Sequence, residues 1–209
     1  MPENKMPVAV LISGTGTTLR NLIQWVEAGQ LDIDIRLVIS SSSQAKGLQF
    51  AADAAIETQV IRLRESGSEE AFSEAIFAAC REAEVRFVAL GGFLKHLIVA
   101  HDFENRVINI HPALIPAFCG KGFYGLRVHQ AALAHGVKVS GCTVHFVDDQ
   151  YDHGPIILQR VVPVLDDDTP EALAARVFAA ECEAYPQVLQ WLAEGRVQVE
   201  GRRVRVRDA

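Results

Sequence analysis

Short apolar segments alternate with segments of helical spacing through residues 8–111, and this alternation limits the possible folds more than any other feature. The first segment, VAVLI at 8–12, is typical of a buried strand, and apolar residues recur at helical spacing after it. Further strands are predicted at 33–40, 58–63, 85–90 and 106–111, and helices at 19–29, 44–54 and 68–83, the last capped by Ser68. Parallel strands need crossover connections, so the sequence predicts an α/β fold with a Rossmann-like, mostly parallel sheet flanked by helices.

The second half of the chain has a different pattern. Two long strand-like segments, 138–147 and 154–164, are separated by the turn-rich DDQYDH, which predicts an antiparallel extension of the sheet. A short helix is expected at 126–136 and a long one at 168–195, which Pro186 should bend or divide. Segment 196–206 reads as a hairpin around Glu200-Gly201. No linker or repeat is evident, so we expect a single domain over 1–209.

Composition excludes several classes of protein. The net charge of −6 gives no general affinity for nucleic acid, and the basic end GRRVRVRDA reads as the solvated face of a last strand. The four cysteines lie far apart without the spacing of a metal site. The apolar run near the N-terminus is too short for a signal peptide, and no 18-residue apolar stretch occurs. We therefore expect a cytoplasmic protein with no metal and no membrane or nucleic-acid partner, for which both a monomer and a homodimer are open.

A glycine-rich loop, SGTGTT at 13–18, joins the first strand to the first helix. Backbone N–H groups at such a helix start can bind phosphate. The dinucleotide fingerprint fits poorly, because its third glycine falls at Leu19 and the second strand ends in ISSSS without an acidic residue. The loop lacks the Gly-Lys-Ser/Thr of a P-loop as well. A monophosphate site is favoured, and a tight turn without a ligand is the alternative.

Polar residues also interrupt the end of the fifth strand, in INIHPALIPAF at 108–118. Asn109 and His111 are two apart, so their side chains point the same way, and an amide beside an imidazole can stabilise an oxyanion and move a proton. Asp152 directly precedes a later strand and is a candidate acid–base group, although spacing does not show that it reaches His111. The alternatives are ordinary hydrogen-bonded side chains at a strand end and a surface turn at 148–152.

Four segments together resemble one family of enzymes. VAVLISGTGTTL, LGGFLKHL, INIHPALIPAF and SGCTVHFVDDQYDHGPIILQRVVPV are similar, in order, to the phosphoribosylglycinamide formyltransferases (glycinamide ribonucleotide transformylases). The resemblance runs from about residue 8 to residue 195. It implies the formyltransferase fold and transfer of a formyl group from 10-formyltetrahydrofolate, as co-substrate, to the amine of glycinamide ribonucleotide in purine biosynthesis. It also implies direct attack by the amine through a tetrahedral intermediate, without a protein nucleophile.

The resemblance assigns a role to each matching residue. Asn109 and His111 would stabilise the oxyanion, His111 in its protonated form and active in proton transfer, and Asp152 would orient His111 and favour its charge. Glu181 would contact the nucleotide substrate. The substrate phosphate would bind at Gly14, Thr15, Gly16, Thr17 and Thr18. The folate would lie along Leu94, Lys95, His96, Leu97, Val147 and Asp148, largely against backbone groups.

This chain departs from the family pattern at several positions. Thr18 stands where Asn is common, Lys95 where Arg is frequent, and Glu69 where better-known members have an Arg. The loop 118–128 is longer than in short members, and Lys121 within it either reaches an anionic substrate or is an ordinary surface lysine. Alternative functions are a formyltetrahydrofolate hydrolase and a sugar-nucleotide N-formyltransferase. A nicotinamide-dependent oxidoreductase is a weaker alternative because of Leu19 and ISSSS, and a non-catalytic binding module is weaker because the three catalytic positions are intact.

Overall fold

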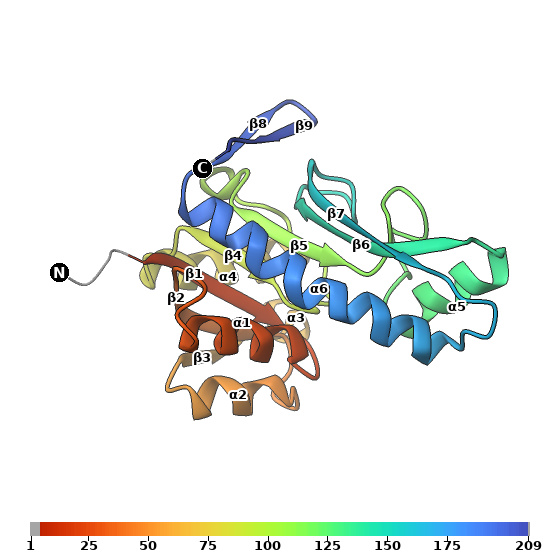
Figure 1. Cartoon of the computed structure of the whole chain (residues 1–209). Coiled ribbons are helices and arrows are strands. Elements are labelled where there is room, and N and C mark those ends of the chain that lie inside the picture. Colours follow the sequence, from red (N-terminus) through yellow and green to blue (C-terminus); the bar gives the residue numbers. More distant parts are fainter. Residues whose placement is uncertain (1–4, 209) are drawn as a thin grey trace. The chain divides into compact units, whose positions relative to one another are not determined.

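The computed structural model describes residues 5–208 of the chain (Figure 1). The chain divides into two compact units, one ending at Ile108 and the other beginning at Asn109. This division falls inside β5 (Val107–His111). Each unit is described below by itself, and the expectation of a single domain stays a prediction.

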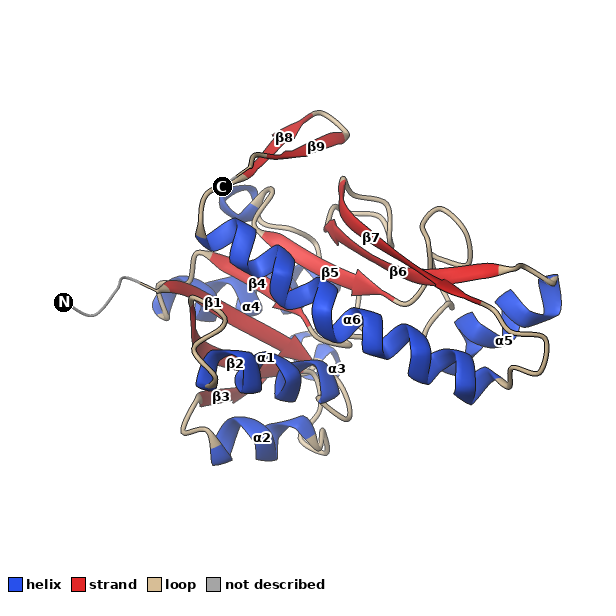
Figure 2. Ribbon diagram, viewed as in Figure 1, coloured by secondary structure: helices blue, strands red, loops and turns tan. Residues whose placement is uncertain are grey.

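Four parallel strands form the sheet of the first unit, in the order β3-β2-β1-β4. The strands are β1 (Met6–Ile12), β2 (Ile33–Ser40), β3 (Glu57–Val60) and β4 (Phe87–Leu90). The helices are α1 (Thr17–Glu27), α2 (Gly47–Asp53), α3 (Leu63–Ser66) and α4 (Glu69–Glu82), followed by a 3₁₀ turn at His101–Phe103. Right-handed crossovers put α1 and α4 on opposite faces of this sheet, as Figure 2 shows.

Local sequence explains these elements. In β1 every residue but Pro7 is buried, as expected of a strand covered on both faces. Helix α1 buries Leu19, Leu22 and Ile23 on one side. At the start of α4 the Ser68 hydroxyl accepts a hydrogen bond from the N–H of Ala71, which confirms the predicted cap.

The second unit is built on an antiparallel pair, β6 (Val139–Phe146) and β7 (Ile156–Pro163). The long helix α6 (Pro170–Ala193) packs against both strands and against α5 (Leu126–His135). The chain ends in the hairpin β8 (Val197–Glu200) and β9 (Arg203–Val206). The full hydrogen-bonded strand order is β3-β2-β1-β4-β5-β6-β7, which confirms a mostly parallel α/β sheet with an antiparallel extension.

The structure corrects some details of the sequence prediction. Helix α6 is not divided at Pro186; the proline lies within one continuous helix and is buried with Tyr185 and Val188, so packing outweighs the missing N–H. The short α3 and the 3₁₀ turn at 101–103 were not predicted, because neither is long enough to show periodicity. The hairpin turn lies at Gly201-Arg202, one residue later than predicted.

Candidate active site

Three of the predicted residues meet in the second unit. Asn109 and His111 lie in β5, and Asp152 lies in the loop between β6 and β7. The Nδ1 atom of His111 is 3.5 Å from Oδ2 of Asp152, and the Asn109 amide donates to Oδ1 of the same carboxylate over 3.4 Å. The side chains of His111 and Asp152 are 5% and 11% exposed. The structure therefore brings an amide and an imidazole onto one largely buried carboxylate.

The backbone around Asp152 fixes its position. Asp152 adopts a left-handed φ of 52°, which is uncommon for a residue with a side chain. Its Oδ2 accepts a hydrogen bond of 2.8 Å from the N–H of Gly120. At Gly154, two residues further, a Cβ atom would overlap the carbonyl oxygen of Phe146, so only glycine fits there. The carboxylate is thus held by contacts made from separate segments.

His111 faces a hydrogen-bond acceptor at each ring nitrogen. Its Nε2 lies 2.9 Å from the carbonyl oxygen of Phe118, and its Nδ1 faces Asp152. Burial lowers the pKa of His111 below its ordinary value, while the Asp152 carboxylate and the Phe118 carbonyl oppose this change. A protonated ring would donate to both acceptors, so the geometry suits an imidazolium that burial otherwise disfavours.

Asp152 itself is set up to be ionised. Burial alone would raise the pKa of Asp152, yet the hydrogen bond with His145, the charge of His111 and the Gly120 N–H hold it below its ordinary value. A carboxylate at neutral pH is what a neighbouring imidazolium needs as a counter-charge.

His145 is a further member of this cluster, which the sequence reasoning did not single out. Its Nδ1 lies 2.7 Å from the carbonyl oxygen of Phe146 and therefore carries the proton. Its Nε2 lies 3.2 Å from the amide nitrogen of Asn109 and 3.8 Å from Oδ1 of Asp152. In the neutral ring Nε2 accepts from Asn109 and orients its amide, whereas in the protonated ring it faces the Asp152 carboxylate as a donor. The available signal was a histidine in the otherwise apolar end of a strand, in TVHFV.

Two segments that carry predicted site residues, the glycine loop and 94–97, meet in the first unit, where three strands end. The Ser13 hydroxyl, after β1, lies 2.7 Å from that of Ser41, after β2, and accepts a 2.9 Å hydrogen bond from the N–H of Leu94, after β4. The glycine loop and the 94–97 segment are therefore neighbours at the carboxyl edge of this sheet, where α/β proteins bind ligands.

The glycine loop opens helix α1 without a side-chain cap. Gly16 is the N-cap residue with φ 71°, and a Cβ there would overlap the Cα of Gly47. No acidic residue occupies the first turn of α1, whereas α4 and α6 are capped by Ser68 and Thr169. Gly14 and Thr15 are exposed. An uncapped helix start of this kind favours an anion.

Comparisons with known proteins identify a family for this chain. Residues 6–189 match the family model described as formyl transferase. The chain belongs to the formyl transferase family. It is 40% identical, over 91% of its length, to a chloroplastic phosphoribosylglycinamide formyltransferase of Vigna unguiculata, and 42% identical, over 94%, to the trifunctional purine biosynthetic protein adenosine-3 of Gallus gallus. It spans only 62% and 19% of those two proteins.

A solved formyl transferase is similar in structure over nearly the whole chain. The glycinamide ribonucleotide transformylase 1 of Symbiobacterium toebii superposes with a TM-score of 0.90 at 40% identity, covering 99% of this chain and 96% of that one. The resemblance found in the motifs is therefore confirmed for the family and for the fold.

Among the other predicted site residues of this formyl transferase, Glu181 has the most perturbed environment. It lies in α6, and burial raises the pKa of its carboxyl group from 4.5 to about 8. Among residues 5–208 no side chain forms an ion pair or hydrogen bond with it. A partly buried carboxyl without a partner is suited to receiving a hydrogen-bond donor from a ligand.

The predicted folate-binding residues differ in what their side chains can do. Leu94 is exposed, whereas Leu97 belongs to the hydrophobic core and offers a ligand only its backbone. His96 lies 3.2 Å from Glu69, so the acidic departure from the family pattern has an ion-pairing partner. The Asp148 side chain is engaged within its own loop, so it too offers mainly backbone.

The long loop contributes backbone groups of Phe118 and Gly120 to this site, whereas Lys121 and the cysteines add little to it. Lys121 and its neighbours Gly120 and Gly122 lie in a turn with φ values of 90° and 96° at the glycines, and the lysine is exposed. Burial raises the pKa of the Cys80 and Cys142 thiols to about 12, which disfavours the nucleophilic thiolate. Within residues 5–208 no three His, Cys, Asp or Glu side chains are grouped as metal ligands, and no helix there could span a membrane.

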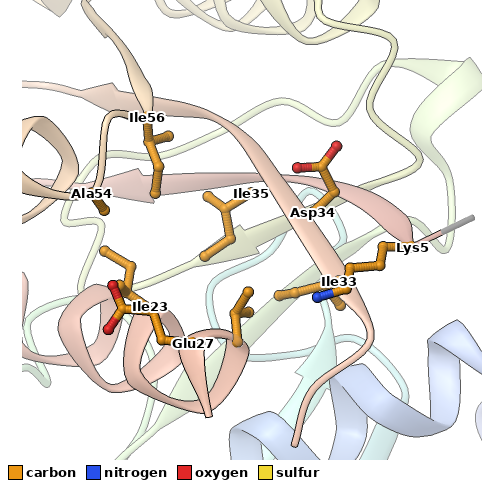
Figure 3. Close-up of a pocket in the computed structure, with 9 residues that line it drawn as sticks. Lys5, Ile23, Glu27, Ile33, Asp34, Ile35, Ala54 and Ile56 are labelled. Carbon is orange, nitrogen blue, oxygen red and sulfur yellow. The ribbon is translucent and has the colours of Figure 1, made fainter. Parts of the chain in front are cut away.

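A pocket of about 210 Å³ in the first unit contains none of these residues (Figure 3). Its mostly aliphatic lining comes from α1, from β2 and from the segment before β3, with Glu27, Asp34 and Lys5 as its charged members. The predicted chemistry of this formyl transferase therefore does not coincide with this cavity.

Proposed function

We propose that this chain transfers a formyl group from 10-formyltetrahydrofolate to the primary amine of glycinamide ribonucleotide, a step of purine biosynthesis. The names of its relatives support this choice of substrates. The observation that carries it is the cluster of Asn109, His111 and Asp152, since two donors gathered on one buried carboxylate suit an acyl transfer through an oxyanion.

The proposed reaction needs no nucleophile from the protein. The substrate amine attacks the formyl carbon, the bond from that carbon to N10 of the folate breaks, and a proton passes from the amine to N10. 10-Formyltetrahydrofolate supplies the formyl group. As negative charge develops on the formyl oxygen, Nε2 of His111 exchanges the Phe118 carbonyl for this oxygen, and the Asn109 amide exchanges its 3.4 Å contact with Asp152 for it. Both groups then donate hydrogen bonds to the formyl oxygen. Asp152 keeps His111 oriented and favours its charged form, and His111 moves the proton.

Binding of the substrates is proposed for the two groups of residues already described. Gly14, Thr15, Gly16, Thr17 and Thr18 bind the phosphate through backbone N–H groups and hydroxyls at the start of α1. Glu181 accepts hydrogen bonds from the nucleotide. The folate lies along Leu94, Lys95, His96, Leu97, Val147 and Asp148, and the reaction uses no metal. The proposal also includes a cytoplasmic location and a monomeric or homodimeric state, which fractionation and light scattering test.

The direct test supplies both substrates and follows the release of tetrahydrofolate by absorbance. We expect release to depend on glycinamide ribonucleotide; release at the same rate without it would make the chain a hydrolase. A sugar-nucleotide amine offered instead tests the other alternative. His111→Ala should lower kcat by roughly 10²–10³, as for loss of an oxyanion donor. His101→Ala, which removes an exposed histidine of the first unit, is the matched control and should leave kcat unchanged.

A further inference from the structure

The turn of the C-terminal hairpin contacts the loop that carries Asp152. In Figure 1 the turn between β8 and β9 lies beside the loop that joins β6 to β7. Arg202, in this turn, donates a 2.7 Å hydrogen bond to the carbonyl oxygen of His153. Its other terminal nitrogen lies 3.1 Å from Nε2 and 3.4 Å from Nδ1 of the same histidine. One guanidinium thus binds both the backbone and the ring of the residue that follows Asp152.

The contact continues from His153 into the rest of the loop. Nδ1 of His153 lies 2.7 Å from Oδ2 of Asp148, and Oδ1 of Asp148 accepts a 2.9 Å hydrogen bond from the N–H of Gln150. Nδ1 donates to the carboxylate, while the arginine nitrogen faces both ring nitrogens, so the guanidinium contacts the ring as a whole and not a single lone pair. Arg202, His153 and Asp148 therefore form one chain of polar contacts that spans the loop on the side of Asp152.

The hairpin is a firm support for this contact. Its two strands pair over four residues each, and Gly201, with φ 61°, gives the two-residue turn that presents Arg202 at the tip. At its base, Arg196 donates a 2.6 Å hydrogen bond to the carbonyl oxygen of Arg207. Arginine suits the position because its planar fork donates to two acceptors at fixed angles, which lysine cannot do.

The loop needs such support. Asp149, Gln150 and Tyr151 are exposed and bury little surface, while Asp152 keeps its left-handed φ. A residue in that region holds its conformation only where the surroundings determine it. Gly120 acts on Asp152 and Gly154 on the end of the loop, and the Arg202 chain holds His153 and, through it, Asp148 at the start of the loop.

We propose that Arg202 is a positioning residue, which holds the 148–153 loop so that Asp152 stays against His111 and Asn109. This role rests on the proposed formyl transfer, in which Asp152 orients His111. Arg202 touches neither the catalytic side chains nor, in this proposal, either substrate. The basic C-terminal segment GRRVRVRDA, which was predicted to be the solvated face of a last strand, therefore also contributes a residue that positions the loop.

The test compares Arg202→Ala and Arg202→Lys with Arg203→Ala. Arg203 is the exposed neighbour in the same hairpin and makes no side-chain hydrogen bond or ion pair within residues 5–208. Amide hydrogen exchange over 148–154, measured without substrates, should be faster by about tenfold in Arg202→Ala, with Arg202→Lys in between, since a charge-assisted hydrogen bond is worth roughly that factor. Arg203→Ala should match the wild type.

Kinetics provide the second readout. In Arg202→Ala we expect kcat to fall by about tenfold, with an unchanged melting temperature and an unchanged KM for glycinamide ribonucleotide. If amide exchange in Arg202→Ala equals that in Arg203→Ala, the proposal is wrong whatever the activity. If exchange in Arg202→Ala is faster but its kcat is unchanged, the link between the loop and catalysis is wrong. A wild-type enzyme without transferase activity is a different result, which refutes the proposed function and leaves the exchange data to decide whether Arg202 holds the loop.

Discussion

Replacing Glu181 with glutamine should change how the stability of the protein depends on pH. Burial raises the pKa of the Glu181 carboxyl group from 4.5 to about 8 in the folded chain, and the unfolded chain restores the ordinary value. Between these two values the folded state keeps a proton that the unfolded state has lost. The free energy of unfolding of the wild type therefore falls as pH rises from about 4.5 to about 8, and glutamine, which does not ionise, removes this fall.

The size of the effect follows from the same two values. The difference between 4.5 and about 8 is about 3.5, which at 1.36 kcal/mol for each unit gives an upper limit of about 5 kcal/mol. Glu181 keeps part of its surface in contact with water, so solvation reduces this limit, and we expect about 1–3 kcal/mol. Glu181→Gln should thus be similar to the wild type at pH 4 and more stable at pH 9.

Urea denaturation followed by circular dichroism at both pH values measures this difference. Glu183→Gln, an exposed glutamate of the same helix, controls for the loss of one negative charge. A gap between Glu181→Gln and the wild type that stays constant from pH 4 to pH 9 would refute the reasoning, because it would mean that Glu181 ionises alike in both states. The same variant should raise KM for glycinamide ribonucleotide, since Glu181 is proposed to bind it.

Three further predictions test other parts of the structure. Gly16→Ala should lower the free energy of unfolding by about 1–3 kcal/mol, because the residue has φ 71° and its Cβ would overlap the start of α2. The control Gly14→Ala, where a Cβ has no atom within 4 Å, should leave the stability unchanged. Thermal denaturation measures both variants. His145→Ala should lower kcat by about tenfold at saturating substrates, because the Asn109 amide loses the acceptor that orients it. Asp168→Asn should destabilise the protein at pH 6 and not at pH 1. Arg176 in α6 and the N–H of Leu165 lower the pKa of Asp168 from 3.8 to about 2. The ionised carboxylate therefore stabilises the fold above pH 3.8, and this stabilisation is lost as pH falls through 2. Melting temperatures at pH 6 and pH 1 measure the difference.

The strand ends could be predicted from sequence because their signals are local. The alternation of apolar strands and helices indicated a parallel sheet, and in such a sheet the residues after each strand share one edge. Ser13 and Leu94 lie 81 positions apart, yet that rule brings their segments together, as their hydrogen bond shows. Side chains alternate between the two faces of a strand, so the spacing of two residues was enough to put Asn109 and His111 on one face.

The partners of these residues could not be predicted in the same way. That Asp152 reaches His111 depends on the course of an irregular loop, which no periodicity describes. The division of the helix at Pro186 was wrong because the free energy that proline costs a helix is smaller than the gain from burying the α6 segment around it. His145 was overlooked because a single histidine in an apolar strand is most often an ordinary buried residue.

The supports of the catalytic cluster differ in kind from the cluster itself. The roles proposed for Asn109, His111 and Asp152 use their side chains, so a motif can identify these residues. Phe118 and Gly120 act through a carbonyl and an N–H that every sequence provides, and Arg202 reaches His153 from a hairpin 49 positions later. A chain could therefore carry the three motif residues and lack the geometry that holds Asp152 at its left-handed φ beside His111. Substitutions far from the motif, above all in the 201–202 turn, should for this reason change catalysis while every residue of the motif remains in place.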